Sequence, residues 1–142
     1  MLWPEERPLC VLAEDDPDVQ FALSSFLRAI GYDLVVVDDG AALLDALAAT
    51  SNDRERDADV IITDVRMPNM NGVSVAQTLR ADGWRQPIVV VSAYDDPAIV
   101  AHVKRLPRTA FFAKPLDPDQ LERTLVELRA ARWPGPSRIF PR

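Results

Sequence analysis

The chain has few of the features that mark secreted, membrane-spanning or nucleic-acid-binding proteins. Its 142 residues include one cysteine, Cys10, so no disulfide can form within the chain. No apolar run approaches the roughly 20 residues of a membrane span, and Pro4 and Pro8 interrupt an opening segment that has no signal-peptide pattern. The 16 basic residues are outnumbered by 22 acidic ones and are not clustered as phosphate binding requires. These absences predict a cytoplasmic protein without membrane or direct nucleic-acid contacts.

Little in the sequence favours nucleophilic chemistry based on cysteine or histidine. Cys10 lies in the apolar run 9–13, which predicts a small buried thiol. His102 is the single histidine, and no serine or cysteine motif pairs with it, so a helix-surface position is its simplest interpretation. At 142 residues with 48% hydrophobic content, the chain is long enough for one domain with a substantial core.

Short apolar runs alternate five times with segments of helical periodicity. Asp16-Pro17, Asp96-Pro97 and Asp117-Pro118 each place a capping residue before a proline suited to the first helical position. Further helices are expected to begin at Asp38-Asp39-Gly40 and after Gly72, and residues 50–59 read as a surface loop or a frayed helix end. The predicted strands are 9–13, 34–37, 60–63, 87–91 and 110–113.

This alternation predicts an α/β fold with a parallel sheet covered by helices on both faces. Right-handed crossovers leave few topologies, and the commonest at this size is the flavodoxin-like three-layer (βα)5 arrangement with strand order 2-1-3-4-5.

Charged and hydroxyl side chains follow four of the predicted strands. Because parallel strands end at one edge of the sheet, these residues should gather there; they are Glu14, Asp15, Asp64, Ser92 and Lys114. Three carboxylates in one place repel each other, by roughly 3 kcal/mol for a pair of charges about 5 Å apart at an effective dielectric near 20. Mg²⁺, a hard cation that prefers oxygen ligands, would remove that cost. Together with Lys114 and Ser92 it could hold the oxygens of a phosphoryl group placed on Asp64.

At these positions the chain resembles the receiver domain of two-component response regulators, and in particular the single-domain, chemotaxis-regulator-like members. The resemblance runs from about Leu9 to Arg132 and depends on four motifs in the family's order and spacing. They are Val11-Leu12-Ala13-Glu14-Asp15-Asp16-Pro17, the segment from Ile61 to Gly72, Val90-Val91-Ser92-Ala93 and Phe112-Ala113-Lys114-Pro115.

The resemblance implies a role for each matching residue. Asp64 would accept a phosphoryl group, and Lys114 and Ser92 would contact its oxygens. Asp15, Asp64 and the backbone carbonyl of Arg66 would bind Mg²⁺, with Glu14 acting mainly through water. Ser92 and Phe111 would form the switch, and Lys114-Pro115 would be a cis peptide.

The chain departs from the family pattern at several positions. Glu14 replaces the commoner aspartate, and Phe111 lacks the hydroxyl of a tyrosine. The loop 106–110 lacks the usual glycine, so the fourth helix is expected to be short or unusually placed. Arg66 and Tyr94 occupy positions that tune phosphate lifetime in the family, so the resemblance implies a tuned lifetime here.

The resemblance implies a signalling switch that catalyses its own phosphorylation and dephosphorylation. Its partners would be a sensor histidine kinase or histidine phosphotransfer protein and a downstream protein effector bound at the fourth helix, fifth strand and fifth helix; a phosphorylation-dependent homodimer is left open. The expected boundaries are a lead-in at 1–8, the receiver domain at 9–133 and a tail at 134–142. That organisation fits a stand-alone receiver without a DNA-binding domain, or a receiver cut from a longer protein.

Three other classes of protein fit the sequence less well. An aspartyl-phosphate hydrolase of the haloacid-dehalogenase type needs a carboxylate where Arg66 stands. A flavin-binding protein needs a phosphate loop where the acidic run from Glu14 to Asp16 would repel phosphate. A phosphate-blind interaction module would be expected to lack Asp15, Asp64 or Lys114, and all three are present.

Overall fold

The computed structural model describes residues 7–53, 58–67, 71–93 and 95–131, which form five strands and five helices in strict alternation. Tyr94 and Trp133, as well as most of the expected lead-in and the whole expected tail, lie outside these residues. The strands are β1 (Leu9–Ala13), β2 (Asp33–Val37), β3 (Val60–Asp64), β4 (Ile88–Ser92) and β5 (Thr109–Ala113). The helices are α1 (Pro17–Ala29), α2 (Gly40–Asp53), α3 (Gly72–Ala81), α4 (Pro97–Lys104) and α5 (Pro118–Ala130).

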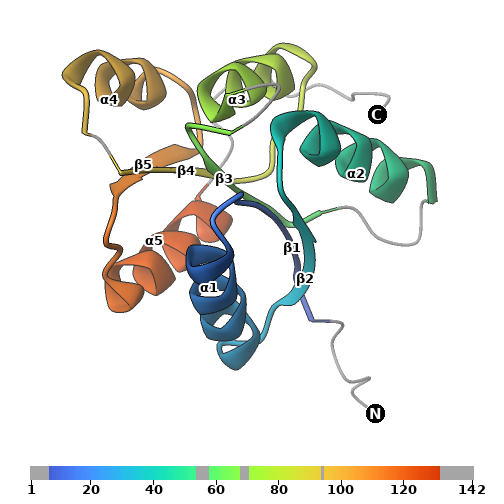
Figure 1. Cartoon of the computed structure of the whole chain (residues 1–142). Helices are drawn as coiled ribbons and strands as arrows, with labels where there is room; N and C mark the ends of the chain where they lie inside the picture. Colours follow the sequence, from blue (N-terminus) through green and yellow to red (C-terminus); the bar gives the residue numbers. More distant parts are fainter. Residues whose placement is uncertain (1–6, 54–57, 68–70, 94, 132–142) are drawn as a thin grey trace.

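The five strands form one parallel sheet in the order β2-β1-β3-β4-β5. Helices α1 and α5 lie on one face of the sheet, and α2, α3 and α4 lie on the other (Figure 1). This is the predicted flavodoxin-like (βα)5 fold with its predicted strand order. The order reverses between β1 and β3, which is where ligands bind in open parallel sheets.

The alternation of side chains along the strands divides the apolar core into two layers. Val11 and Ile61 point toward α2, α3 and α4, whereas Leu12 and Ile62 point toward α1 and α5. Strands β1, β3 and β4 are buried along their whole length, so they can be almost continuously apolar. Cys10 is fully buried in the α1 and α5 layer, as predicted.

The helix starts follow the capping signals in the sequence. The carboxylates of Asp16, Asp96 and Asp117 accept hydrogen bonds from the first backbone amides of α1, α4 and α5, and proline follows each of them. Such caps contribute about 1 kcal/mol each. Helix α2 continues to Asp53, so the first residues of the segment expected to be a loop or a frayed helix end are helical. Helix α4 has only eight residues, as the unusual loop after it predicted.

Arg108 lies in the loop between α4 and β5, which lacks the glycine that the family resemblance led us to expect. Its φ is +50°, in the left-handed region that disfavours residues with a side chain. The guanidinium compensates by donating hydrogen bonds to the carbonyl oxygens of Leu128, Arg129 and Arg85 at 2.8 to 3.3 Å. The loop is therefore fixed to the C-terminal end of α5, where a cation also complements the helix dipole.

Arg80 connects the same loop to the end of α3. Its half-buried guanidinium donates to the carbonyl oxygens of Trp84, Gln86, Pro107 and Arg108 at 2.6 to 2.9 Å. Two arginines thus hold the amino edge of the sheet opposite the carboxyl ends of the strands. None of the helices in the described part of the chain has the length and apolar character needed to cross a membrane.

Candidate functional site: a carboxylate cluster at the carboxyl edge

Two acidic side chains and one lysine meet where β1, β3 and β5 end. The ammonium of Lys114 donates to Oε1 of Glu14 at 2.7 Å and to Oδ2 of Asp64 at 2.8 Å. Each of these three residues comes two positions after a strand residue whose side chain faces α1 and α5. Because side chains alternate along a strand, all three side chains lie on that side of the sheet and converge. Glu14 and Asp64 are buried, with 1% and 7% of their surface exposed. One ammonium therefore faces two buried carboxylates.

Asp15 brings a third carboxylate to the cluster and is exposed to solvent. Oxygen atoms from Glu14, Asp15 and Asp64 lie within 4.8 Å of one another. A hard divalent cation takes carboxylate oxygens as ligands and keeps several waters, which an exposed member of the cluster permits. The donor set therefore fits Mg²⁺. Asp15 offers the most open oxygens, because both oxygens of Glu14 and both oxygens of Asp64 already accept hydrogen bonds.

Several neighbouring groups fix the position of Glu14. Its second oxygen, Oε2, accepts from the backbone amide of Asp16 at 3.1 Å, and its carbonyl accepts from Nε2 of Gln20 at 2.9 Å. Its amide donates to the carbonyl of Val37 on β2 at 3.0 Å. Glu14 is thus a rigid part of the site and not a mobile surface carboxylate.

Asp64 is held by the turn that follows β3. Oδ1 accepts from the amide of Arg66 at 3.3 Å, while the hydroxyl of Thr63 donates to the Asp64 carbonyl at 3.0 Å. The amide of Gly72 donates to the Val65 carbonyl at 2.9 Å, which closes the turn. A Cβ at Gly72 would lie against the Asp64 backbone, only 2.9 Å from its carbonyl carbon, so this position requires glycine.

Burial and charge shift the ionisation of the cluster. Loss of solvent raises the pKa of the Glu14 carboxyl to about 7, against the opposing hydrogen bond from Lys114. Burial acts to lower the pKa of Lys114, but the hydrogen bonds to Asp64 and Glu14 outweigh it and the pKa rises above its ordinary value. Lys114 therefore stays charged at neutral pH, and the cluster retains an excess of negative charge that a divalent cation could offset.

Ser92 and Phe111 lie on the other face of the sheet from the cluster. Ser92 ends β4 and is buried, and its carbonyl accepts from the Lys114 amide at 2.8 Å. Val90 pairs with Phe111 across β4 and β5, and Ser92 lies two residues further along the same face. Both Val90 and the half-buried Phe111 belong to the layer under α2, α3 and α4. Sequence reasoning placed Ser92 at the correct strand end but did not foresee this difference in direction.

Of the other residues to which the resemblance gives a role, the structure describes all except Tyr94. Arg66 is exposed directly after the strand that carries Asp64. Lys114-Pro115 is a cis peptide, as expected. His102 is half-buried on α4 and lines a cavity of about 420 Å³ with Arg66 and Asn71. Sequence reasoning missed Gln20, and no local pattern distinguishes it from other polar residues of α1.

Comparison with known proteins identifies the family. The family model of the response regulator receiver domain matches residues 10–126 of this chain. This range includes every residue of the cluster. The chain therefore belongs to the receiver domains of two-component systems, a phosphorylation-competent family of signalling domains. Receiver domains of this family bind Mg²⁺ in the active site, and the acidic cluster is present here.

Two relatives carry this domain as part of a longer protein. The chain is 32% identical to the DNA-binding response regulator MtrA of Mycolicibacterium smegmatis over 115 residues, which cover 81% of this chain and 47% of MtrA. It is 33% identical to the sensory/regulatory protein RpfC of Xanthomonas campestris over 127 residues, covering 86% of this chain and 17% of RpfC. The chain thus spans half or less of the length of these relatives.

Solved structures agree with the fold. The receiver domain of NarL from Mycobacterium tuberculosis superposes with a TM-score of 0.76 at 26% identity, covering 90% of this chain and 100% of that one. The receiver domain of the sensor histidine kinase PA1611 from Pseudomonas aeruginosa, solved with a magnesium ion in its active site cleft, has a TM-score of 0.72 at 26% identity and covers 88% and 99%.

Proposed function

We propose that this chain is a phosphorylation-activated receiver that takes a phosphoryl group onto Asp64 from a phosphohistidine of a sensor kinase or phosphotransfer protein. The arrangement of Lys114 supports this proposal most directly. Its ammonium bonds to Asp64 at 2.8 Å, in a site where Asp15 offers a further carboxylate to a metal. We take the receiver domain to span residues 9–133, with a lead-in at 1–8 and a tail at 134–142.

Asp64 has the properties of an oriented nucleophile. Lys114 and the Arg66 amide each hold one of its carboxylate oxygens, so the side chain has a defined direction at the end of a rigid strand. In the transfer, a carboxylate oxygen forms a bond to phosphorus as the bond between phosphorus and the donor's imidazole nitrogen breaks. Positioning and charge neutralisation supply most of the catalysis in such reactions.

The metal site would use Asp15, Asp64 and the backbone carbonyl of Arg66, with Glu14 acting through water. Mg²⁺ bound there would supply positive charge to the oxygens of the transferred group. Two observations favour these residues: their carboxylates converge, and the PA1611 receiver holds magnesium in its cleft. The ammonium of Lys114 would exchange one of its carboxylate partners for a phosphoryl oxygen.

Signalling would follow from a change at Ser92 and Phe111. The Ser92 hydroxyl would move toward the phosphoryl group, and Phe111 would turn further into the layer beneath α4. Their location on one face of β4 and β5 supports such coupling. The surface of α4, β5 and α5 would then bind a downstream protein, in a cytoplasmic two-component pathway.

The proposal is tested by incubating the protein with acetyl phosphate and Mg²⁺ and measuring the intact mass. One phosphoryl adduct is expected on the wild type and none on Asp64→Asn. The matched control Asp82→Asn changes an exposed aspartate at the end of α3 and should leave the adduct in place. An unmodified wild type, or an undiminished adduct on Asp64→Asn, would contradict the proposal.

A further inference from the structure

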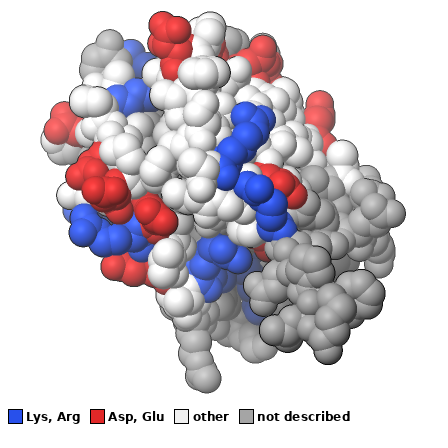
Figure 2. Space-filling model, turned by 90° about the horizontal axis from the view of Figure 1, so that it is seen from below, with Lys and Arg blue, Asp and Glu red and all other residues white. Residues whose placement is uncertain are grey.

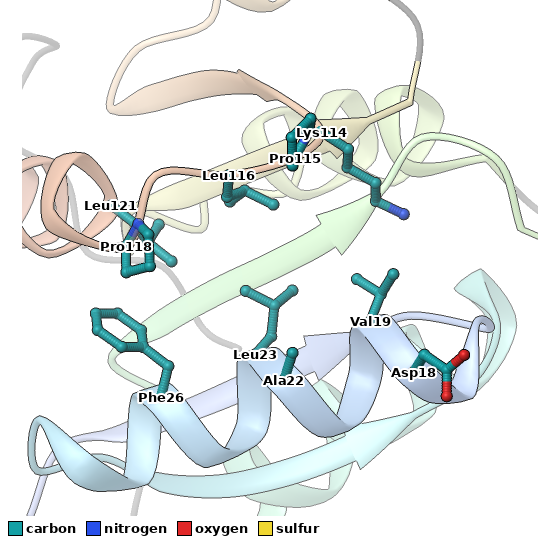
Figure 3. Close-up of a pocket in the computed structure, with 10 residues that line it drawn as sticks. All are labelled: Asp18, Val19, Ala22, Leu23, Phe26, Lys114, Pro115, Leu116, Pro118 and Leu121. Carbon is teal, nitrogen blue, oxygen red and sulfur yellow. The ribbon is translucent and has the colours of Figure 1, made fainter.

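An apolar cavity opens between α1 and the segment that joins β5 to α5. Its volume is about 520 Å³, within the range of small-molecule sites. Figure 3 shows side chains of α1 facing those of the opposite segment across this space. The apolar lining includes Val19, Leu23, Phe26, Pro115, Leu116 and Leu121.

The charged residues that line the cavity lie at one of its ends. Lys114 and Asp18 lie at one end, and Phe26 and Pro118 lie at the other (Figure 3). The single ammonium at the first end already bonds to the carboxylates of Glu14 and Asp64. Asp18 is exposed and lines the cavity, so the local balance there is negative.

Exposed carboxylates add negative charge around the cavity. Asp16 precedes the lining residues of α1, and Asp117 and Asp119 flank Pro118 where α5 begins, so carboxylates lie near both ends. In Figure 2, which shows the molecule from below, acidic and basic groups lie next to one another, and uncharged side chains fill much of the remaining described surface.

We propose that this cavity binds a small amphipathic cation, with its apolar body against Phe26 and Leu121 and its positive group near Asp18. The apolar lining favours burial of a ring or a branched chain. An anionic ligand is disfavoured, because the ammonium of Lys114, the one cation among the described lining residues, is already bonded to two carboxylates. An uncharged ligand would gain the apolar contacts without the electrostatic attraction. This inference does not depend on phosphoryl transfer to Asp64.

Lys114 would couple this cavity to the carboxylate cluster. Its side chain lines the cavity, and its ammonium bonds to Asp64 at 2.8 Å. A ligand packed against that side chain changes the environment of a residue shared by both sites. Coupling between two sites is reciprocal. The factor by which a ligand in the cavity changes binding at the cluster is therefore also the factor by which binding at the cluster changes the affinity of the cavity.

The test uses three probes that share one ring system and differ in charge: 1-naphthylmethylamine, 1-naphthalenemethanol and 1-naphthylacetate. Each is titrated into the full chain while methyl signals of Val19, Leu23, Leu116 and Leu121 are followed by NMR. Saturable shifts are expected with the amine, with about threefold weaker binding of the alcohol and still weaker binding of the acetate. The signal of the Lys114 side chain should move together with the methyl signals.

Two variants of α1 locate the site. Ala22→Trp places a large ring at an exposed position that lines the cavity and should abolish the shifts, whereas Phe21→Trp changes an exposed neighbour outside the lining and should preserve them. Asp18→Asn should weaken the amine but leave the alcohol unchanged. Absence of saturable shifts at these methyl groups, equal binding of the acetate and the amine, or retained binding in Ala22→Trp would each overturn the proposal.

Discussion

Buried Glu14 should make the stability of the metal-free protein decrease as pH rises. Its carboxyl has a pKa of about 7 in the folded protein against an ordinary value of 4.5, mainly because burial disfavours the charged form. The folded state therefore holds the proton more tightly than the unfolded state between these two values. The stabilisation is fully present below pH 4.5 and is lost as pH rises through about 7.

The size of the effect follows from the difference between the two pKa values. At 1.36 kcal/mol for each unit, the contribution is about 3 kcal/mol across this range. Glu14→Gln cannot ionise, so its free energy of unfolding should lack this part of the decline. The variant should equal or exceed the wild type at pH 7.5 in EDTA, where the wild type carries a buried charge.

The assay is urea unfolding followed by far-UV circular dichroism between pH 4.5 and 8, with EDTA throughout. Glu122→Gln removes an exposed carboxylate on α5 and serves as the control, since it should retain the wild-type dependence on pH. The reasoning fails if wild type and Glu14→Gln show parallel curves over the whole range. That result would mean that the Glu14 carboxyl ionises equally well in the folded and unfolded states.

Three further substitutions test the structure around the site. Asp15→Asn should be no less stable than the wild type without Mg²⁺, because it relieves repulsion among three carboxylates; a clear drop in Tm in EDTA would contradict this. Arg80→Ala should cost about 3 kcal/mol in urea unfolding, because four backbone carbonyls lose a charged donor, whereas exposed Arg123→Ala should change stability by less than about 0.5 kcal/mol. Gly72→Ala should lower Tm and displace the NMR signals of Asp64, because its Cβ meets the Asp64 backbone; unchanged signals would argue against close contact.

Most of the fold could be predicted from local patterns. Five short apolar runs and three Asp-Pro starts define the alternation, and parallel topology then brings Glu14, Asp64 and Lys114 to one edge. These inferences succeed because hydrophobic periodicity and capping act over a few residues. The location of the site could also be predicted, because all the strands of a parallel sheet end at the same edge.

The parts that escaped prediction depend on contacts between distant segments. The sequence could not show that Gln20 holds the Glu14 carbonyl, or that Ser92 faces a different layer from Lys114. Nor could it show that Arg108 compensates for its left-handed backbone by donating to the end of α5, 20 residues away. The polar composition of residues 50–59 left both a surface loop and a frayed helix end open, and residues 50–53 belong to the end of α2.

The most direct test of the central claim locates the phosphoryl group on the chain. Protein treated with acetyl phosphate and Mg²⁺ is reduced with borohydride, which converts an aspartyl phosphate into homoserine, and the peptides are then sequenced by mass spectrometry. Homoserine is expected at position 64, and omission of Mg²⁺ should abolish it. Homoserine at another aspartate, or none at position 64 in protein that carries the adduct, would contradict the account.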